Sequence, residues 1–449
     1  MVKEDEEDTP IGIFLRWGAI VMTKMFFDTH MHAMNLVHPY FVSFVDSVAN
    51  GFAEFVVSGS LSPGYLLTPA NRGQQGLITV MNLFNVFERS IDEIFLLIED
   101  DLSGKFFRQE EDHKNKPSHA IYPETPYISN NKFIFRSQAY DKYALIPLVM
   151  DFSSISNEWG KGYYTRVSHD KLLSYVEDTL EGMEKYRKTR PEGLLEFFPF
   201  LGINPEAHPI HFIEYLLDTY IRKNRSYPYR IRKRDEKRQF WGVKLYPPLG
   251  MDPWPKTDKI KLSKVEYIYS FCEAYDIPII THCDDQGFRG VTAKLAQKFT
   301  DPASWRIVLE QYPQLRIDFA HYGKQYKPMV KPSLKKLLEN SIVNEPWFNE
   351  IISLMDTYEH VYADFSFTGA DHKFYEQLKT FIEGQGNAPL SNKILHRSMF
   401  GSDFSVNLSK VESYTNYMRI FETSPFSDDA VELFGNKNPL EFLGLKRTK

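Results

Sequence analysis

The stretch "FFDTHMHAMN" (Phe26–Asn35) is an apolar run that turns acidic and then carries two histidines one residue apart. Its apolar start predicts a buried strand, and His30 and His32 fall where that strand ends. Residues i and i+2 of a strand point to the same face, so we expect the two imidazoles side by side, with Asp28 deeper on that face as a partner that holds a ligand. Taken alone, the pair fits a metal site and an ordinary polar strand end equally well.

The same unit recurs along the chain: a short β-prone run ends in polar residues, and a helix-like segment follows. Eight runs fit it, at residues 25–32, 144–153, 194–204, 240–250, 277–285, 315–323, 360–367 and 397–404. Several are continuous apolar runs, as in strands buried on both faces of a parallel sheet. Strands that alternate with helices form right-handed βαβ units, and eight in a row predict an α/β protein with a (β/α)₈ TIM barrel. An open, doubly wound sheet is the alternative.

Two stretches interrupt the regular spacing and predict insertions. Residues 33–143 follow the first strand and are too many for a bare βα connection. They contain a helix-like part at 75–102 and a polar, loop-like part at 109–132. We therefore expect a large helical insertion over one end of the barrel, as a lid or a wall for the substrate. The basic run 222–239 predicts a loop insertion before strand 4.

Composition and charge limit the classes of function. The chain has 449 residues, a net charge of −6 and 43% apolar residues, which is ordinary for a globular protein. We expect no nucleic-acid or membrane partner, and we interpret the basic run 222–239 as a solvated loop, with nucleic-acid or phosphate binding as the alternative. The expected partner is a small-molecule substrate, and a homo-oligomer is left open.

The start of the chain and the cysteines bear on its compartment. Residues 1–24 begin acidic where a secretory signal would be basic, and they predict an N-terminal tail and lead-in segment before a barrel domain at 25–449. The chain has two cysteines, which form no disulfide framework and fit a reducing compartment. A cytoplasmic location is the prediction.

Polar residues stand at the ends of several predicted strands, and they indicate a site only when they are taken together. A lone histidine there is more often a hydrogen-bonding residue than a ligand, and a lone aspartate can be a helix N-cap. The active-site face of a barrel lies at the carboxyl ends of its strands, where residues far apart in sequence meet. Imidazole and carboxylate groups are the ligands that a divalent metal takes. The residues in such positions predict a metal site: His30, His32, Lys244, His282, His321 and Asp403.

Several motifs resemble the amidohydrolase superfamily of metal-dependent barrel enzymes, and within it the amidohydrolase-related branch of metal-dependent hydrolases. They are "FFDTHMH" (26–32), "GVKLYPP" (242–248), "ITHCDD" (280–285), "DFAHYG" (318–323), "MFGSDF" (399–404) and the closing "FGNKNPLEFLGL" (434–445). The resemblance covers about residues 25–445. It is specific at the five strand motifs and vague in the two insertions.

The resemblance implies a role for each of these residues. His30 and His32 would bind the more buried metal. Asp403 would bind the same metal and take a proton from the attacking water. His282 would be a further ligand. His321 would bind a second metal, or act as a free acid or hydrogen-bond donor that polarises the substrate.

The number of metals depends on one lysine. In binuclear members of the superfamily a lysine on strand 4 is carbamylated and bridges two metals, and Lys244 stands at this position. In mononuclear members the lysine can be unmodified. We expect one tightly held divalent metal ion, with zinc as the first choice, and a second ion if the site is binuclear.

The leading function is metal-dependent hydrolysis of an amide, lactone or related bond of a small molecule. The alternative is a metal-dependent, non-oxidative decarboxylase or hydratase that acts on a small carboxylic acid, for which Arg289 would clamp the anion. Tyr246, Asp285 and Gln286 are further expected substrate contacts, although Asp285 and Gln286 could instead cap the next helix. A catalytically degenerate barrel used for binding is the alternative from another class.

Overall fold

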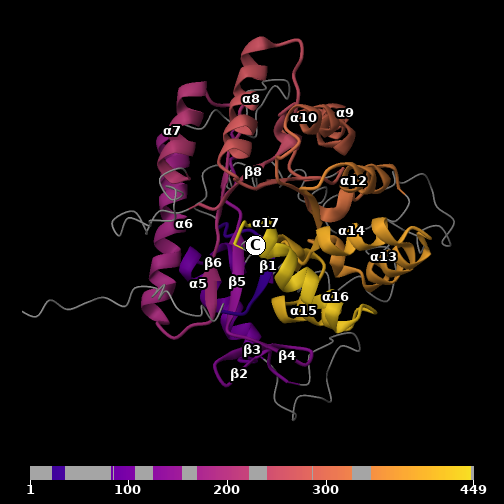
Figure 1. The fold of residues 1–449 in the computed structure, drawn as a ribbon. Coiled ribbons are helices and arrows are strands. Elements are labelled where there is room, and N and C mark those ends of the chain that lie inside the picture. Colours follow the sequence, from indigo (N-terminus) through magenta and orange to yellow (C-terminus); the bar gives the residue numbers. More distant parts are fainter. Residues whose placement is uncertain are drawn as a thin grey trace, which may run out of the picture.

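The parallel strands lie at the predicted positions. A computed structural model describes residues 23–35, 82–83, 85–106, 125–153, 169–221, 240–285, 287–325 and 345–445. Its parallel strands are β1 (Met25–Met31), β5 (Lys142–Pro147), β6 (Leu195–Phe197), β7 (Phe200–Gly202), β8 (Gly242–Leu245), β9 (Ile279–Thr281), β10 (Ile317–Phe319), β11 (Val361–Asp364) and β12 (Ser398–Met399). They lie at the centre of the molecule with helices around them (Figure 1). The prediction of an α/β protein is confirmed.

The strands are hydrogen-bonded in two parallel rows. One row has the order β1-β5-β6, and the other has the order β12-β11-β10-β9-β8-β7. Isolated parallel bridges join Met31 to Phe404, just after β12, and Leu148 to Phe200 of β7. Each row follows the order of the chain, as expected of successive βαβ units.

The predicted strand 194–204 is split into two. β6 pairs with β5, whereas β7 pairs with β8, and Phe198 and Pro199 lie between them. Proline has no N–H to donate to a ladder, so it fits the point where a strand leaves one neighbour for the next.

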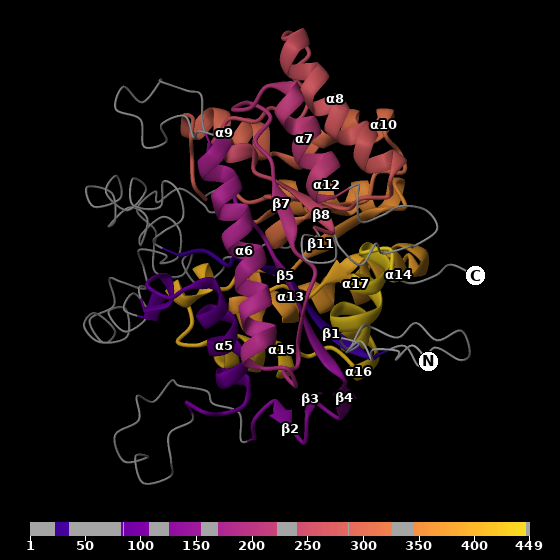
Figure 2. The ribbon, with the colours of Figure 1, turned by 90° about the vertical axis from the view of Figure 1, so that its left-hand side faces the viewer.

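Helices follow the strands and cover the outer side of the rows, as Figures 1 and 2 show. They are α5 (Ile91–Leu102), α6 (His169–Thr189), α7 (Ile210–Tyr220), α8 (Lys259–Ala274), α9 (Ala293–Thr300), α10 (Arg306–Gln311), α12 (Pro346–Thr357), α13 (His372–Gly384), α14 (Ala388–Arg397), α15 (Tyr414–Glu422), α16 (Asp428–Glu432) and α17 (Asn438–Phe442). Short 3₁₀ turns follow several strands, among them η4 (Pro247–Leu249), η6 (Ala320–Gly323), η7 (Thr368–Ala370) and η8 (Val406–Ser409). No helix in the described ranges is both long enough and apolar enough to cross a membrane.

Two hydrophobic clusters fill the interior. The larger one joins the strands to the surrounding helices. The smaller one combines residues from one side of the strands, such as Phe27, Ile280 and Tyr362, with Phe442 and Leu443 at the end of α17. The strands are thus packed on both sides, which explains their continuous apolar runs.

The described parts of the insertion do not form one helical layer over one end of the strands. The helix α5 lies within the predicted helical part 75–102, but it packs beside α6 and α15 as an ordinary outer helix (Figure 2). An antiparallel sheet follows, made of β2 (Ile128–Ser129), β3 (Lys132–Phe135) and β4 (Gln138–Tyr140). It was not predicted, since its residues were interpreted as loop or helix.

This small sheet lies at the starting ends of β1 and β5, in the lower part of Figures 1 and 2. The ring of Phe133 packs on Phe26 at 5.2 Å between centroids, and the backbone N–H of Lys24 donates to Asp141 over 2.8 Å. The sheet is therefore far from the end of β1 that carries the histidines and cannot be a lid over them. Residues 36–81 and the basic run 222–239 lie outside the described residues.

Candidate metal centre

The first candidate ligand group lies at the end of β1. Nε2 of His32 is 3.1 Å from Oδ1 of Asp403, and Nε2 of His30 is 3.5 Å from the same oxygen. All three side chains are buried, and their ligand atoms are close enough to hold one ion. The backbone N–H of Asp403 donates to the carbonyl of His30 over 2.7 Å, so the segment after β12 is fixed beside β1. The structure thus brings His30 and His32 next to Asp403, which lies 371 positions after His32 in the sequence.

A second candidate group adjoins the first. His282 and His321, at the ends of β9 and β10, approach within 3.2 Å between Nδ1 and Nε2, and Nε2 of His282 is 3.2 Å from Oδ1 of Asp284. The ring centroids of His30 and His321 are 5.0 Å apart, so the two groups share one space. Asp284 was not among the predicted ligands, although it stands two residues after His282 and its position in "THCDD" was a usable signal.

Asp364 and Ser366 connect the two groups, and sequence reasoning missed both. Oδ2 of Asp364 lies 2.8 Å from Nδ1 of His30, and its Oδ1 accepts the backbone N–H of His321 over 3.1 Å. The Ser366 hydroxyl lies 3.1 Å from Nδ1 of His30 and 2.9 Å from Nδ1 of His321. Asp364 lies inside the predicted strand 360–367 and is the last residue of the observed strand β11. A carboxylate within an otherwise apolar, aromatic-rich run was the signal that could have revealed it.

The electrostatics favour neutral imidazoles and ionised carboxylates. Burial, helped by the charge of Lys244, lowers the pKa of His30 from 6.5 to about 3. Burial alone would raise the pKa of Asp364, but its hydrogen bonds with His30 and Ser366 outweigh it and hold that pKa well below its ordinary value. An ionised carboxylate only accepts, so Nδ1 of His30 donates to Asp364 and Nε2 keeps its lone pair.

Asp403 follows the same pattern. Burial raises its pKa, yet the hydrogen bond with His32 and the nearby histidine charges outweigh this and lower the pKa from the ordinary value of 3.8. The pKa of His282 is also lowered, first by burial and against the charge of Asp284. His30, His282 and Asp403 are therefore poised in the protonation states that ligands need.

Lys244 lies in β8 and is buried, as its predicted place in a strand requires. Among the described residues, its Nζ has no hydrogen-bond partner. Burial lowers its pKa to about 8, against the attraction of Asp364 and Asp403. Asp318, a further buried carboxyl in β10, has its pKa raised well above the ordinary value by burial and by the charge of Asp364.

Backbone strain gathers around these groups. Four of the eight non-glycine residues with positive φ in the described ranges lie here: His321 (62°), Tyr322 (57°), Phe367 (57°) and Asp403 (61°). Side chains other than glycine and asparagine visit this region at a cost, and such residues cluster at functional sites.

Asp28 does not lie where strand alternation placed it. The register of β1 against β5 shifts between Asp28 and Met31, which breaks the simple alternation. Oδ1 of Asp28 accepts the backbone N–H groups of His30 and Ser402, and Oδ2 accepts the Tyr414 hydroxyl over 2.6 Å. Asp28 thus holds the backbone of the ligand segments, and Asp364 takes the part that Asp28 was expected to play at the imidazole.

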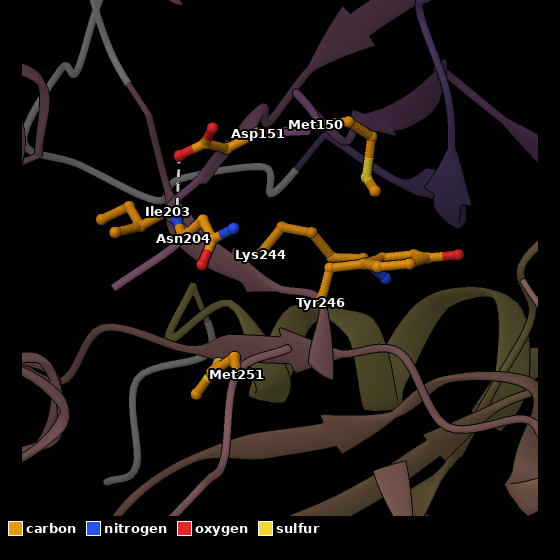
Figure 3. Close-up of a pocket in the computed structure, with 7 residues that line it drawn as sticks. All are labelled: Met150, Asp151, Ile203, Asn204, Lys244, Tyr246 and Met251. Atoms are coloured by element: carbon orange, nitrogen blue, oxygen red, sulfur yellow. Dashed lines mark hydrogen bonds between the residues drawn. The ribbon is translucent and has the colours of Figure 1, made fainter. Parts of the chain in front are cut away.

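The structure describes three of the four predicted substrate contacts. The ring of Tyr246 stacks near His282 at 4.4 Å between centroids, and Tyr246 and Lys244 both line a pocket with Met150, Asp151, Ile203, Asn204 and Met251 (Figure 3). Asp285 is buried and its backbone N–H donates to Lys324. Arg289 is half-buried, and within the described part of the chain it forms no hydrogen bond or ion pair. Gln286 lies outside the described residues.

Comparison with known proteins identifies a family for part of the chain. Residues 226–445, just under half of the chain, match the family model described as Amidohydrolase. None of the proteins with curated functions matches the chain in sequence.

Solved structures similar to this chain are distant. A 5-carboxyvanillate decarboxylase from Novosphingobium aromaticivorans, with manganese and 4-hydroxy-3-methoxy-5-nitrobenzoic acid, is 10% identical with a TM-score of 0.44, over 94% of this chain and 96% of that one. A 2,6-dihydroxybenzoate decarboxylase from Rhizobium is 11% identical with a TM-score of 0.38, over 68% and 84%. A protein named as a probable 2-pyrone-4,6-dicarboxylic acid hydrolase from Acinetobacter baumannii is 13% identical with a TM-score of 0.40, over 68% and 84%. Likeness at this level carries no argument about the chemistry.

The residues at the end of β1 fit a divalent metal on their own geometry. Nε2 of His30 is buried and, among the described residues, has no hydrogen-bond partner, while its Nδ1 is fixed by Asp364. A carboxylate that orients a histidine in this way is the usual support of a metal-binding imidazole. With His32 and Asp403 it forms a mixed nitrogen and oxygen donor set that suits zinc or manganese.

Proposed function

We propose that the protein is a metal-dependent hydrolase that cleaves an amide, lactone or related bond of a small molecule. The observation that carries this proposal is the buried meeting of His30, His32 and Asp403, whose ligand atoms converge within reach of one ion. Burying two imidazoles and a carboxylate without water is costly unless the groups are paired or bind a metal. A metal site accounts for that arrangement.

We further infer that the strands close into a (β/α)₈ barrel. The bridge between Met31 and Phe404 and the bridge between Leu148 and Phe200 join the two parallel rows at both places where they would otherwise end. A closed barrel leaves no sheet edge and gathers every strand end at one mouth.

Asp403 is proposed as the general base. A divalent metal held by His30 and His32 would lower the pKa of a water molecule towards about 7. The lowered pKa of Asp403 keeps its carboxylate ionised and able to accept a proton near neutral pH. It would then pass that proton to the leaving group.

His321 and His282 are proposed to act on the substrate side of the same space. Nδ1 of His321 is 3.0 Å from the carbonyl of Ser366, which can only accept, so Nδ1 carries the proton and Nε2 points towards His282. With Asp284 these histidines form a second ligand group, and Lys244 would bridge two metals if it is carbamylated. We propose one tightly bound metal, with the second group as the weaker site.

A second candidate function is decarboxylation or hydration of a small carboxylic acid at the same centre. The observation that favours it is a pair of lysines, Lys324 and Lys410, whose charges interact with Asp284 of the second ligand group. Cations beside a metal centre suit an acidic substrate. Release of carbon dioxide would separate a decarboxylase from a hydrolase.

The test begins with elemental analysis of protein expressed with zinc or with manganese. We expect at least one tightly bound equivalent, and two equivalents would support the binuclear form. His30→Ala and His32→Ala should lose metal and activity together, whereas His372→Ala, at an exposed histidine, should keep both. Asp403→Asn should lower turnover on a panel of amides, lactones and esters by about 10²- to 10⁴-fold. Protein that binds no metal after supplementation would instead support a barrel used only for binding.

A further inference from the structure

Two lysines lie beside the metal centre on loops that follow strand ends. Lys324 comes directly after η6, which carries His321, and Lys410 comes directly after η8, seven residues beyond Asp403. Nζ of Lys410 is 3.6 Å from the centroid of the Phe367 ring and 3.5 Å from the Phe367 carbonyl oxygen. The Phe367 ring in turn meets the His321 ring edge-on at 6.4 Å between centroids. The ammonium group is therefore held one aromatic ring away from the second ligand group.

The charge of this ammonium group interacts with both ligand groups. Lys410 interacts with Asp403 of the first group and with Asp284 of the second. Lys324 interacts with Asp284 and Asp285. Burial, with the charge of Lys324 as the next cause, lowers the pKa of Lys410 to about 7. Burial likewise lowers the pKa of Lys324.

Keeping two like charges close together in a buried place costs free energy. The nearby carboxylates offset that cost, but Asp284 and Asp403 are also the oxygens that a divalent cation would take. Once those oxygens are bound to a metal, the carboxylates stabilise the ammonium groups less, and the mouth of the site becomes more positive. A negatively charged group of a ligand would restore the balance there.

We propose that Lys410, together with Lys324, binds an oxyanion group of the substrate beside the metal centre. The inference rests on the proposed function, since it takes the two ligand groups as the reacting centre. It assigns to these lysines the clamp that the sequence suggested for Arg289. A carboxylate and a phosphonate or phosphate share the chemistry that an ammonium group recognises, and the substrate class is thus a small organic anion.

The experiment measures binding of two matched probes, benzoate and phenylphosphonate, to the zinc-loaded full chain by calorimetry at low salt. We expect at least one of them to bind, and the probe that binds more tightly indicates a carboxylate or a phosphorus oxyanion. Lys410→Met should weaken that binding by about 10- to 100-fold, as expected for loss of a hydrogen bond to a charged group. Lys410→Arg should retain most of it. Added salt should weaken binding to the wild type more than to Lys410→Met.

Lys294→Met is the matched control, because Lys294 is an exposed lysine of α9 and should not change probe binding. Lys324→Met provides a second variant if Lys410→Met does not fold, and circular dichroism checks this. Equal probe binding in the wild type and in both lysine variants would overturn the proposal, as would the absence of binding to the wild type. Metal content is measured on the same samples. Loss of metal in the wild type would count against the proposed function, whereas unchanged metal with unchanged probe binding would count against the lysines alone.

Discussion

Nδ1 of His30 lies 2.8 Å from Oδ2 of Asp364, and this contact joins the end of β1 to the end of β11. The other oxygen of Asp364 accepts the backbone N–H of His321, so one carboxylate fixes a residue of each ligand group. Both side chains of the pair are fully buried. The geometry of the candidate metal site therefore depends on a carboxylate that belongs to neither ligand group.

Asp364→Asn should weaken zinc binding by about 10- to 100-fold, the usual effect of removing such a support. The amide keeps the shape but loses the charge that holds the proton on Nδ1 of His30. Competition with a chelator measures the affinity. Asp356→Asn, in an exposed ion pair with Lys393, is the control and should bind zinc as the wild type does. An unchanged affinity in Asp364→Asn would mean that Asp364 does not orient His30.

The contribution of His30 to the stability of the metal-free protein should fall as the pH drops from about 6.5 towards 3. The native state keeps His30 neutral, since its pKa is lowered from 6.5 to about 3, whereas the unfolded chain takes up a proton in this window. The unfolded state then binds more protons, and stability rises with pH. Asp28 acts in the opposite direction. Burial raises its pKa from 3.8 to about 6, so the native state binds more protons than the unfolded chain in this window, and the contribution of Asp28 to stability falls as the pH rises. The difference in pH dependence of stability between the wild type and a His30 variant isolates the contribution of the histidine.

His30→Gln should therefore flatten the dependence of the free energy of unfolding on pH between 4 and 6, with a slope smaller by up to about 1.4 kcal/mol per pH unit. His372→Gln, at an exposed position, should keep the wild-type slope. Urea unfolding in a series of buffers gives both slopes. Equal slopes in wild type and His30→Gln would contradict a neutral, buried His30 in the native state.

How far the sequence predicts the site depends on whether a residue's role is local. The strand at 25–32 and the histidines at its end follow from an apolar run and its polar end, and the structure brings His30, His32 and Asp403 together as expected. Asp364 was missed because its role arises only when β11 packs next to β10 and its end meets the end of β1. Asp28 was misplaced because a register shift against β5 breaks the alternation that the sequence implies.

The antiparallel sheet β2–β4 was missed for a different reason. Its strands are two to four residues long, and they include polar residues such as Lys132 and Gln138, so no period could develop. What stabilises the sheet is the packing of Phe133 and Phe135 on Phe26, a contact between segments more than a hundred residues apart. Tertiary contacts of this kind override local propensity.

Asp151→Asn should destabilise the protein by about 2–4 kcal/mol. Asp151 is fully buried beside the pocket of Figure 3, and its carboxylate accepts from Nε2 of His208 over 2.7 Å, from the backbone of Asn204 over 2.9 Å and from Ser153. The amide can serve fewer of these donors and removes the charge that faces His208. Urea or thermal unfolding measures the loss, and Asp356→Asn should change stability by less than about 1 kcal/mol. A loss no larger than that of the control would mean that the Asp151 network does not stabilise the fold.

Gly287→Ala should disturb the second ligand group. Gly287 has φ of 86°, and a Cβ there would collide with the Tyr246 hydroxyl and lie 2.8 Å from Nε2 of His282. The left-handed backbone alone costs an alanine about 1–2 kcal/mol, and the contact with His282 cannot be relieved without moving a ligand or the loop. We expect a melting temperature several degrees lower, since about 1 kcal/mol corresponds to a few degrees in a domain of this size, together with lower turnover.

Gly384→Ala is the control, because Gly384 ends α13 with open space around its Cβ and no positive φ, so alanine should leave the melting temperature unchanged or slightly higher. Equal melting temperatures and equal turnover in the two variants would contradict the close approach of Gly287 to His282.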